Sequence, residues 1–172
     1  VNAEKYWLES LEIKKKILPS NHPSLAQSYF YLGEHYYFQS EYKKVIEKIE
    51  LALPIFLKSY GENSSYVINC YNSLAYSELE LLNFDKAIDI FNQILSLKIK
   101  DRFPIYYIYA ISGLAKTYYI LANYNEAKKY IEIFFNEYAN VFENENQIYA
   151  TTLLFSSKIY LDLGNYQKAL EL

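Results

Sequence analysis

A helical pattern recurs along the chain about every 42 residues. Its most regular marker is an aromatic residue that is followed three positions later by a small or β-branched residue. The aromatic residues, at intervals of 42, 40 and 42 residues, are Tyr42, Phe84, Tyr124 and Tyr166, and their partners are Val45, Ala87, Ala127 and Ala169. A fixed period of this size indicates a repeat architecture, in which each unit buries its apolar side only against its neighbours.

Each repeat is predicted to hold two helices joined by a short turn. The first helix of one repeat shows apolar or small residues at i, i+3, i+4 and i+7, namely Tyr29, Leu32, Gly33 and Tyr36. The expected turns are Gln39-Ser40-Glu41, Leu82-Asn83, Ala122-Asn123 and Gly164-Asn165. Glycine and asparagine tolerate the left-handed conformation that ends a helix, and asparagine also caps the next one. We see no alternating pattern between hairpin turns, so the predicted fold class is all-α.

Residues 1–172 are therefore predicted to form a single array of helical hairpins. The expected parts are the second helix of a truncated repeat at 1–20, full repeats at 23–61, 65–100 and 104–142, and a truncated repeat at 146–172. Such an array has no capping repeats, which repeat proteins normally need for solubility. We expect the chain to be a piece of a longer protein, or to cover its ends by self-association.

The motifs of these units resemble the tetratricopeptide repeat, TPR, in which Leu-Gly-x2-Tyr is followed by Ala-x3-Phe. The best matches are Leu32-Gly33-x2-Tyr36 with Val45-x3-Ile49, and Leu114-Ala115-x2-Tyr118 with Ala127-x3-Ile131. The long period, and the segment Asn21-His22-Pro23-Ser24-Leu25-Ala26, are similar to the kinesin light chain-like subgroup. The resemblance implies an α-solenoid of stacked antiparallel hairpins in a right-handed superhelix. Among the departures from the pattern, Ser40, Leu82 and Ala122 stand where the family favours glycine.

The resemblance also implies a ligand-binding surface, since family members bind ligands along a concave face formed by the first helices. The corresponding residues are Phe30, Glu34, Tyr37, Asn72, Tyr76, Leu79, Tyr109, Ser112, Lys116, Tyr119, Leu154, Lys158 and Leu161. Tyrosine suits recognition because it combines a large contact area with a polar tip. Lysines at 116 and 158 could attract acidic groups, whereas Glu34 would repel a carboxylate, which argues against binding of chaperone C-terminal tails.

These residues also have an ordinary structural interpretation. Aromatic residues at helical spacing commonly belong to the core between repeats, and Asn72 fits a solvated surface as well as a binding face. Lysines such as Lys116 and Lys158 are often simply solvated. The hypothesis of a binding face is therefore stronger for the set than for any one member.

Composition and motifs exclude several other functions. The formal net charge is −3, and Arg102 is the only arginine, so we expect no nucleic-acid partner. We find no His/Cys cluster for a metal and no glycine-rich phosphate loop, and we expect no cofactor. Neither His22 nor His35 has a catalytic setting, and Cys70 lies in an apolar helical segment typical of an inert core thiol. Because these residues form no catalytic constellation, we expect that the protein is not an enzyme. No apolar run is long enough to span a membrane and the start does not resemble a signal peptide, so we expect a cytoplasmic protein.

Two further hypotheses remain beside an interaction module that binds a peptide or partner segment. The chain could be the peptide-sensing domain of a signalling protein, in which case ligand binding would compact it. It could also be an accessory domain of a multidomain enzyme, in which case a catalytic segment would lie outside these residues.

Overall fold

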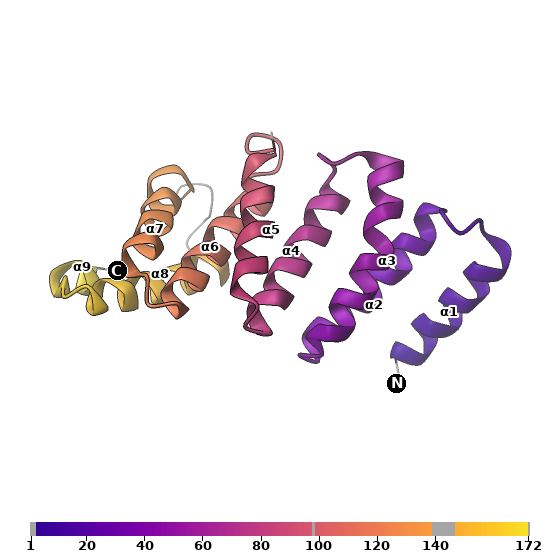
Figure 1. The fold of residues 1–172 in the computed structure, drawn as a ribbon, viewed down its shortest axis with the longest axis horizontal. Coiled ribbons are helices and arrows are strands. Elements are labelled where there is room, and N and C mark those ends of the chain that lie inside the picture. The colour runs from indigo at the N-terminus through magenta and orange to yellow at the C-terminus, as the bar shows by residue number, and fades with distance from the viewer. Residues whose placement is uncertain (1–2, 98, 139–146, 172) are drawn as a thin grey trace. The chain divides into compact units, whose positions relative to one another are not determined.

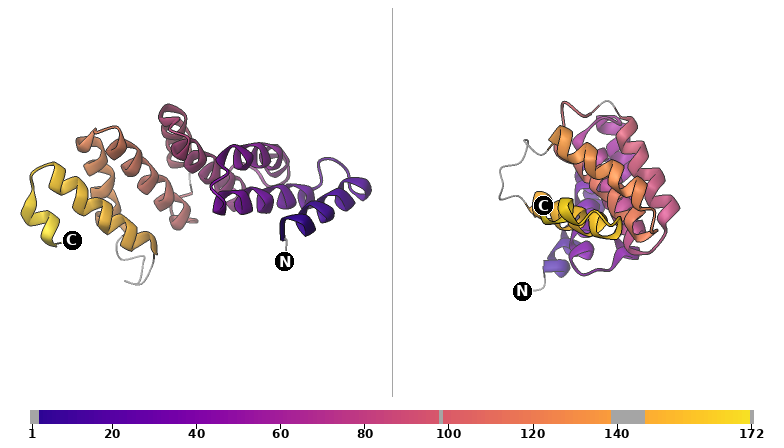
Figure 2. Two further views of the ribbon diagram at one scale, coloured as in Figure 1. Left: turned by 90° about the horizontal axis from the view of Figure 1, so that it is seen from below. Right: turned by 90° about the vertical axis from the view of Figure 1, so that its left-hand side faces the viewer.

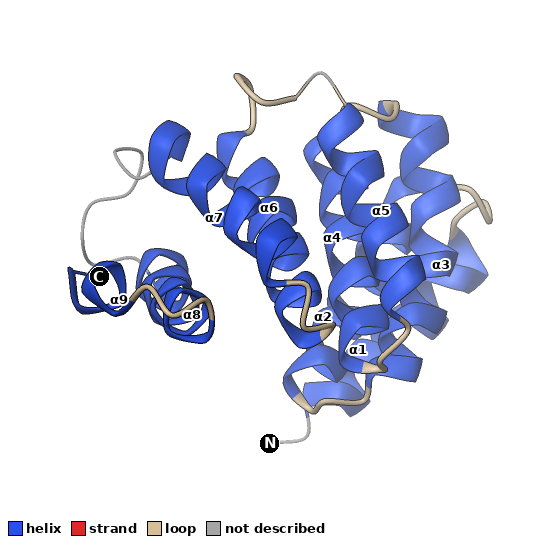
Figure 3. Ribbon diagram, turned by 60° about the vertical axis from the view of Figure 1, so that its left-hand side comes forward, coloured by secondary structure: helices blue, strands red, loops and turns tan. Residues whose placement is uncertain are grey.

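The computed structural model describes residues 3–97, 99–138 and 147–171, and all regular structure within these ranges is helical (Figures 1 and 3). The helices are α1 Ala3–Ile17, α2 Pro23–Phe38, α3 Tyr42–Tyr60, α4 Ser65–Glu80, α5 Phe84–Ser96, α6 Pro104–Ile120, α7 Tyr124–Tyr138, α8 Gln147–Asp162 and α9 Tyr166–Glu171. The predicted all-α fold class is confirmed. The predicted boundaries at residues 1, 142, 146 and 172 lie outside the described residues.

The chain forms two compact units, Val1–Ile90 (unit 1) and Phe91–Leu172 (unit 2), with the boundary inside α5. In unit 1, α1 contacts α2, while α3 contacts both α2 and α4. In unit 2, α6 pairs with α7 and α8 pairs with α9, and α8 also contacts α6 (Figure 2). Short turns make each pair an antiparallel hairpin. The division of the chain into one array of repeats stays a prediction.

In each of the four hairpins an equivalent turn joins the two helices. In each turn one backbone amide donates to the carbonyl five residues earlier, as in a Schellman motif. These bonds are Glu41 to Tyr36, Asn83 to Glu78, Asn123 to Tyr118 and Asn165 to Tyr160, at 2.8–2.9 Å. The left-handed residue of the turn precedes the donor, with φ of 58°, 63°, 56° and 72° at Ser40, Leu82, Ala122 and Gly164. Three of the four are therefore not glycine and adopt a conformation that costs energy for a residue with a Cβ.

Side chains and prolines fix where several helices begin. The helix α2 starts with Pro23, and the Nδ1 atom of His22 accepts a hydrogen bond from the Ser24 amide at 3.2 Å. At α7 the carboxamide of Asn123 accepts from the backbone amide of Glu126 at 3.3 Å. His22 therefore has a structural role as the cap of α2, and the asparagine of the turn before α7 caps the following helix as expected.

Small buried residues allow helices to approach one another closely. A Cβ added to Gly33 would lie 2.9 Å from the Cδ1 atom of Ile49. A Cβ added to Gly113 would lie only 2.1 Å from the Cζ atom of Phe91. Other small residues of the repeats are buried as well, namely Ala75, Ala87, Ala115, Ala127 and Ala169. The second helices bury one apolar side, illustrated by Val45, Ile49, Ala52 and Phe56 of α3.

Candidate binding surface on the first helices

The first helices of the hairpins are α2 and α4 in unit 1, and α6 and α8 in unit 2. In unit 1, α2 and α4 contact each other although α3 separates them in sequence. The hydroxyl of Ser73 on α4 donates to the Oε1 atom of Glu34 on α2 at 2.9 Å. The structure thus brings side chains 39 residues apart into direct contact.

The predicted residues of unit 1 differ in accessibility. Phe30, Glu34 and Tyr37 on α2 are half-buried, as is Tyr76 on α4. Leu79 is 1% exposed and belongs to the core, so we leave it out of the candidate surface. Its burial follows from the position of α4, which buries residues on more than one side and packs against both α2 and α3.

Asn72 is also largely enclosed, with 7% of its surface exposed. Its neighbours along α4, Tyr71 and Leu74, are buried as well. The amide of Asn72 can therefore offer only a small accessible area to a ligand.

The electrostatic environment between α2 and α4 is negative. Burial, followed by the nearby charge of Glu80 and weaker effects of Tyr42 and Glu34, raises the pKa of Tyr37 to about 12. Burial raises the pKa of the Cys70 thiol to about 12, and the carboxylate of Glu34 contributes to this rise. Cys70 is therefore protonated at neutral pH and has the properties of an inert core residue.

In unit 2 the first helices α6 and α8 are in contact as well. The hydroxyls of Ser112 and Thr152 lie 3.4 Å apart. The ring of Tyr119 meets Phe155 edge to face, with 5.7 Å between centroids. Burial, followed by a hydrogen bond to Asp162, raises the pKa of Tyr119. Of the predicted residues, Ser112 and Tyr119 thus touch α8, where Leu154 and Lys158 lie.

A stripe of exposed side chains runs along α8. Leu154 and Leu161 are 58% and 48% exposed, and the exposed Lys158 lies between them at helical spacing. The Lys158 ammonium lies 5.9 Å from the centroid of the Phe155 ring. On α6, Tyr109 is exposed and Lys116 is half-buried. We call Leu154, Lys158 and Leu161 the α8 stripe.

Sequence reasoning missed three residues that connect neighbouring first helices, Ser73, Thr152 and Phe155. A signal for two of them was present in the repeat itself. The pairs Glu34–Ser73 and Ser112–Thr152 are separated by 39 and 40 residues, close to the repeat period. Positions one period apart on successive first helices are therefore candidates for contact.

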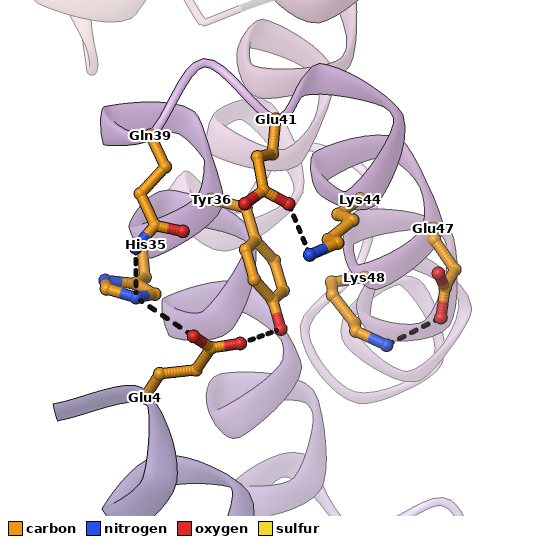
Figure 4. A network of polar contacts seen from close by, with 8 residues as sticks. All are labelled: Glu4, His35, Tyr36, Gln39, Glu41, Lys44, Glu47 and Lys48. Atoms are coloured by element: carbon orange, nitrogen blue, oxygen red, sulfur yellow. Dashed lines mark hydrogen bonds and ion pairs between the residues drawn. The ribbon is translucent and has the colours of Figure 1, made fainter. Parts of the chain in front are cut away.

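A polar network around His35 joins α1 to α2 and α3 (Figure 4). The Tyr36 hydroxyl donates to the Oε1 atom of Glu4 at 2.8 Å, and the His35 Nε2 atom lies 4.0 Å from the other oxygen of Glu4. Trp7 meets His35 edge to face at 5.1 Å, and the Lys44 ammonium lies 4.9 Å from the Tyr36 ring centroid. Burial, followed by the hydrogen bond to Glu4, raises the pKa of Tyr36 to about 12. The phenol stays protonated, and the network has a structural role.

Within residues 3–97, 99–138 and 147–171, no three His, Cys, Asp or Glu side chains gather as a metal site would require. Of the helices described, none combines the length and apolar character needed to cross a bilayer.

The fold and the contacts between successive first helices define the class of protein, an all-α repeat protein with the TPR-like solenoid fold. No protein-family model matches the sequence, and no curated protein sequence is similar to it at a significant level.

Solved structures are similar in fold. BtubC (BKLC) from P. vanneervenii matches with a TM-score of 0.82 and 23% identity, over 98% of this chain and 68% of that one. The kinesin light chain-like TPR repeats of Podosopora anserina match with a TM-score of 0.76 and 20% identity, over 98% of this chain and 81% of that one. The apo form of RapI matches with a TM-score of 0.75 and 19% identity, over 95% of this chain and 58% of that one. At these identities the likeness concerns the fold alone.

Proposed function

We propose that the chain is a protein-interaction module that binds a peptide, or an extended segment of a partner protein, on the faces of its first helices. The partner segment would lie against α2 and α4 in unit 1 or α6 and α8 in unit 2. Among the predicted contact residues, the proposal keeps Phe30, Glu34, Tyr37, Asn72, Tyr76, Tyr109, Ser112, Lys116, Tyr119, Leu154, Lys158 and Leu161. Leu79 is omitted because it is buried.

The observation that carries the proposal is the α8 stripe. Leu154 and Leu161 leave about half of their surface in water, although leucine side chains stabilise a protein most when they are buried. The lysine between them can pair with an acidic side chain of a partner. An apolar stripe with a central charge is the pattern by which an amphipathic partner segment is recognised.

The similar structures add support of a general kind. They place this fold among TPR-like repeat proteins, whose usual role is to bind other proteins. RapI was solved as an apo form, a term that implies a ligand for RapI. A fold alone does not fix a function, so the stripe and not the likeness is the basis of the proposal.

The proposal is tested by selecting binders from a display library of short random peptides. Leu154→Ser with Leu161→Ser removes the apolar part of the stripe at exposed positions. The control, Ile17→Ser with Leu51→Ser, makes the same chemical change at exposed positions of second helices, where Ile17 is 71% and Leu51 44% exposed. We expect the parent and the control to retain the selected peptides and the stripe variant to lose those bound on unit 2. Failure of the parent to select any peptide would refute the proposal.

We further propose that the module has no catalytic role, no nucleic-acid partner and a cytoplasmic location. The buried, protonated Cys70 and the capping role of His22 support the first point. The net charge of −3 supports the second. A single cysteine, which forms no disulfide within the chain, supports the third.

A further inference from the structure

The first helices of unit 1 contain no basic residue other than histidine. Neither α2 nor α4 has a lysine or arginine, whereas together they carry Glu34, Glu78 and Glu80. The lysines of residues 1–90 lie on α1, α3 and α5, at positions 5, 14, 15, 16, 43, 44, 48, 58 and 86. Neither α2 nor α4 therefore supplies a lysine or arginine that could pair with these glutamates.

Glu78 does not contribute to this surface, because its charge is balanced locally. It is buried, one of its oxygens lies 3.5 Å from the Lys86 ammonium, and the other accepts a hydrogen bond from the Asn83 amide at 2.6 Å. Its partners come from the turn after α4 and from α5. Glu78 therefore stabilises the hairpin rather than a ligand.

Glu34 is in a different situation. Its side chain is half-buried between α2 and α4, and its Oε1 atom accepts a hydrogen bond from Ser73. Within the described residues, no lysine, arginine or histidine nitrogen lies within 4.0 Å of its carboxylate. A hydroxyl donor offsets only part of the cost of removing a carboxylate from water, so a cation that approached the second oxygen would be strongly favoured.

Two aromatic residues flank Glu34 along α2. Phe30 and Tyr37 are half-buried and stand one turn before and one turn after Glu34 on the same side of α2. An ammonium or guanidinium group over an aromatic face gains cation–π attraction in addition to the ion pair. The groups that act electrostatically on the Tyr37 hydroxyl are Glu80, Tyr42 and Glu34. None of them is basic, which agrees with a site for a cation.

We propose that unit 1 selects a partner segment through a lysine or arginine side chain, which pairs with Glu34 between Phe30 and Tyr37. This inference rests on the proposed function and specifies the chemistry of its ligand. An acidic segment would be repelled at the same place. The preference belongs to unit 1, because the first helices of unit 2 carry Lys116 and Lys158 instead.

The experiment uses the whole chain and the same display library of short random peptides. The test variant is Glu34→Gln, which keeps the shape and can still accept the hydrogen bond from Ser73. The matched control is Glu50→Gln, which makes the same change of net charge at an exposed position of α3. Circular dichroism shows whether both variants are as helical as the parent.

We expect peptides selected by the parent and by the control to be enriched in lysine and arginine, and those selected by Glu34→Gln to lack this enrichment. Replacing the basic residue of a selected peptide by glutamine should weaken its binding to the parent about ten- to a hundredfold, as a charge-assisted hydrogen bond would. The same replacement should leave binding to Glu34→Gln unchanged.

The outcomes separate the two proposals. If the parent selects peptides that show no preference for basic residues, or if Glu34→Gln and the parent bind the same basic peptides equally, the inference about Glu34 is wrong while the interaction module stands. Equal loss of basic peptides in Glu50→Gln would also overturn it, since the effect would then be one of net charge. If the parent selects no peptide at all, the proposed function fails and this inference fails with it.

Discussion

Gly113 offers the sharpest test of the packing described above. It is buried in α6, and a Cβ at this position would lie 2.1, 2.5 and 2.6 Å from three ring atoms of Phe91. Carbon atoms in contact prefer separations of about 3.5–4 Å, so the ring would have to move by more than ~1 Å. Phe91 is fully buried, and its rigid ring has no free space into which to turn. We therefore predict that Gly113→Ala destabilises the protein.

The magnitude follows from two opposing effects. Overpacking of a core costs about 1–3 kcal/mol, and an overlap this large belongs near the upper end. Alanine in a helix interior regains about 1 kcal/mol relative to glycine. The net loss should be about 1–2 kcal/mol, and a chain of this size should lose about 2–4 °C in Tm for each kcal/mol.

Gly33→Ala is the matched comparison. Its Cβ would meet the Cδ1 atom of Ile49 at 2.9 Å, which is the end of a flexible side chain. A small shift of this methyl group would relieve the contact, so the helix-propensity gain should offset most of the cost. We expect the stability of this variant to stay within about 0.5 kcal/mol of the parent.

Urea unfolding followed by circular dichroism measures both variants. Phe91→Leu removes the ring and supplies the second half of a double-mutant cycle. In that background Gly113→Ala should cost less than in the parent. The reasoning is refuted if Gly113→Ala is as stable as Gly33→Ala, or if its cost is the same with and without the Phe91 ring.

Four other predictions concern side chains outside this contact. Tyr36→Phe removes the hydrogen bond to Glu4 and should lower the free energy of unfolding by about 1 kcal/mol, measured by urea unfolding. The pKa values of Tyr36 and Tyr37 are raised from 10.0 to about 12 in the folded chain. Their contribution to the free energy of unfolding is therefore complete below pH 10.0 and is lost as the pH rises towards 12. Midpoints of urea unfolding, measured at a series of pH values, will show this loss. The buried thiol of Cys70 should react with a thiol reagent at mildly alkaline pH only after unfolding. Leu82→Gly should raise the free energy of unfolding by about 1 kcal/mol, because Leu82 is exposed and has a φ of 63°.

Each of these predictions has a control or a contrary result. Tyr60→Phe, at an exposed tyrosine, should leave stability unchanged, and a loss equal to that of Tyr36→Phe would contradict the hydrogen-bond argument. The alkaline fall should be smaller in Tyr36→Phe. Equal thiol reactivity in the folded and unfolded chain would contradict the burial of Cys70. Gly164→Ala should lose about 1 kcal/mol, because φ is 72° and nothing lies within 4 Å of the added Cβ. No gain in Leu82→Gly would contradict the strain argument.

The helices and turns could be predicted because burial in this fold follows a simple period. The spacing of Leu32, Gly33 and Tyr36 placed them on one side of a helix, and all three are buried. Small residues of the repeat motifs, such as Ala115 and Ala127, are buried as well. Periodicity reports which side of a helix is apolar, and in a solenoid of hairpins that side is packed against a neighbour.

The candidate surface was less predictable, because first helices pack on more than one side. Leu79 fits the pattern of a surface position, yet it is buried by the packing of α4. The partner of Glu34 depends on how α2 and α4 lie against each other, which the sequence of either helix does not state. Likewise, local propensity argues against a left-handed leucine at position 82, and only the resemblance to a family pattern pointed to that residue.

The left-handed residues of the hairpin turns have a consequence for how such a protein can change over time. Ser40, Leu82 and Ala122 are exposed, lie at the ends of helices and are not among the residues considered for binding. Each is one substitution from a relaxed glycine turn. Substitutions on a recognition surface tend to destabilise, and this chain could compensate for them at positions that a partner need not contact. Under the proposed function, specificity and stability would depend on separate sets of residues, and a new ligand preference could arise while changes in the turns maintain the fold.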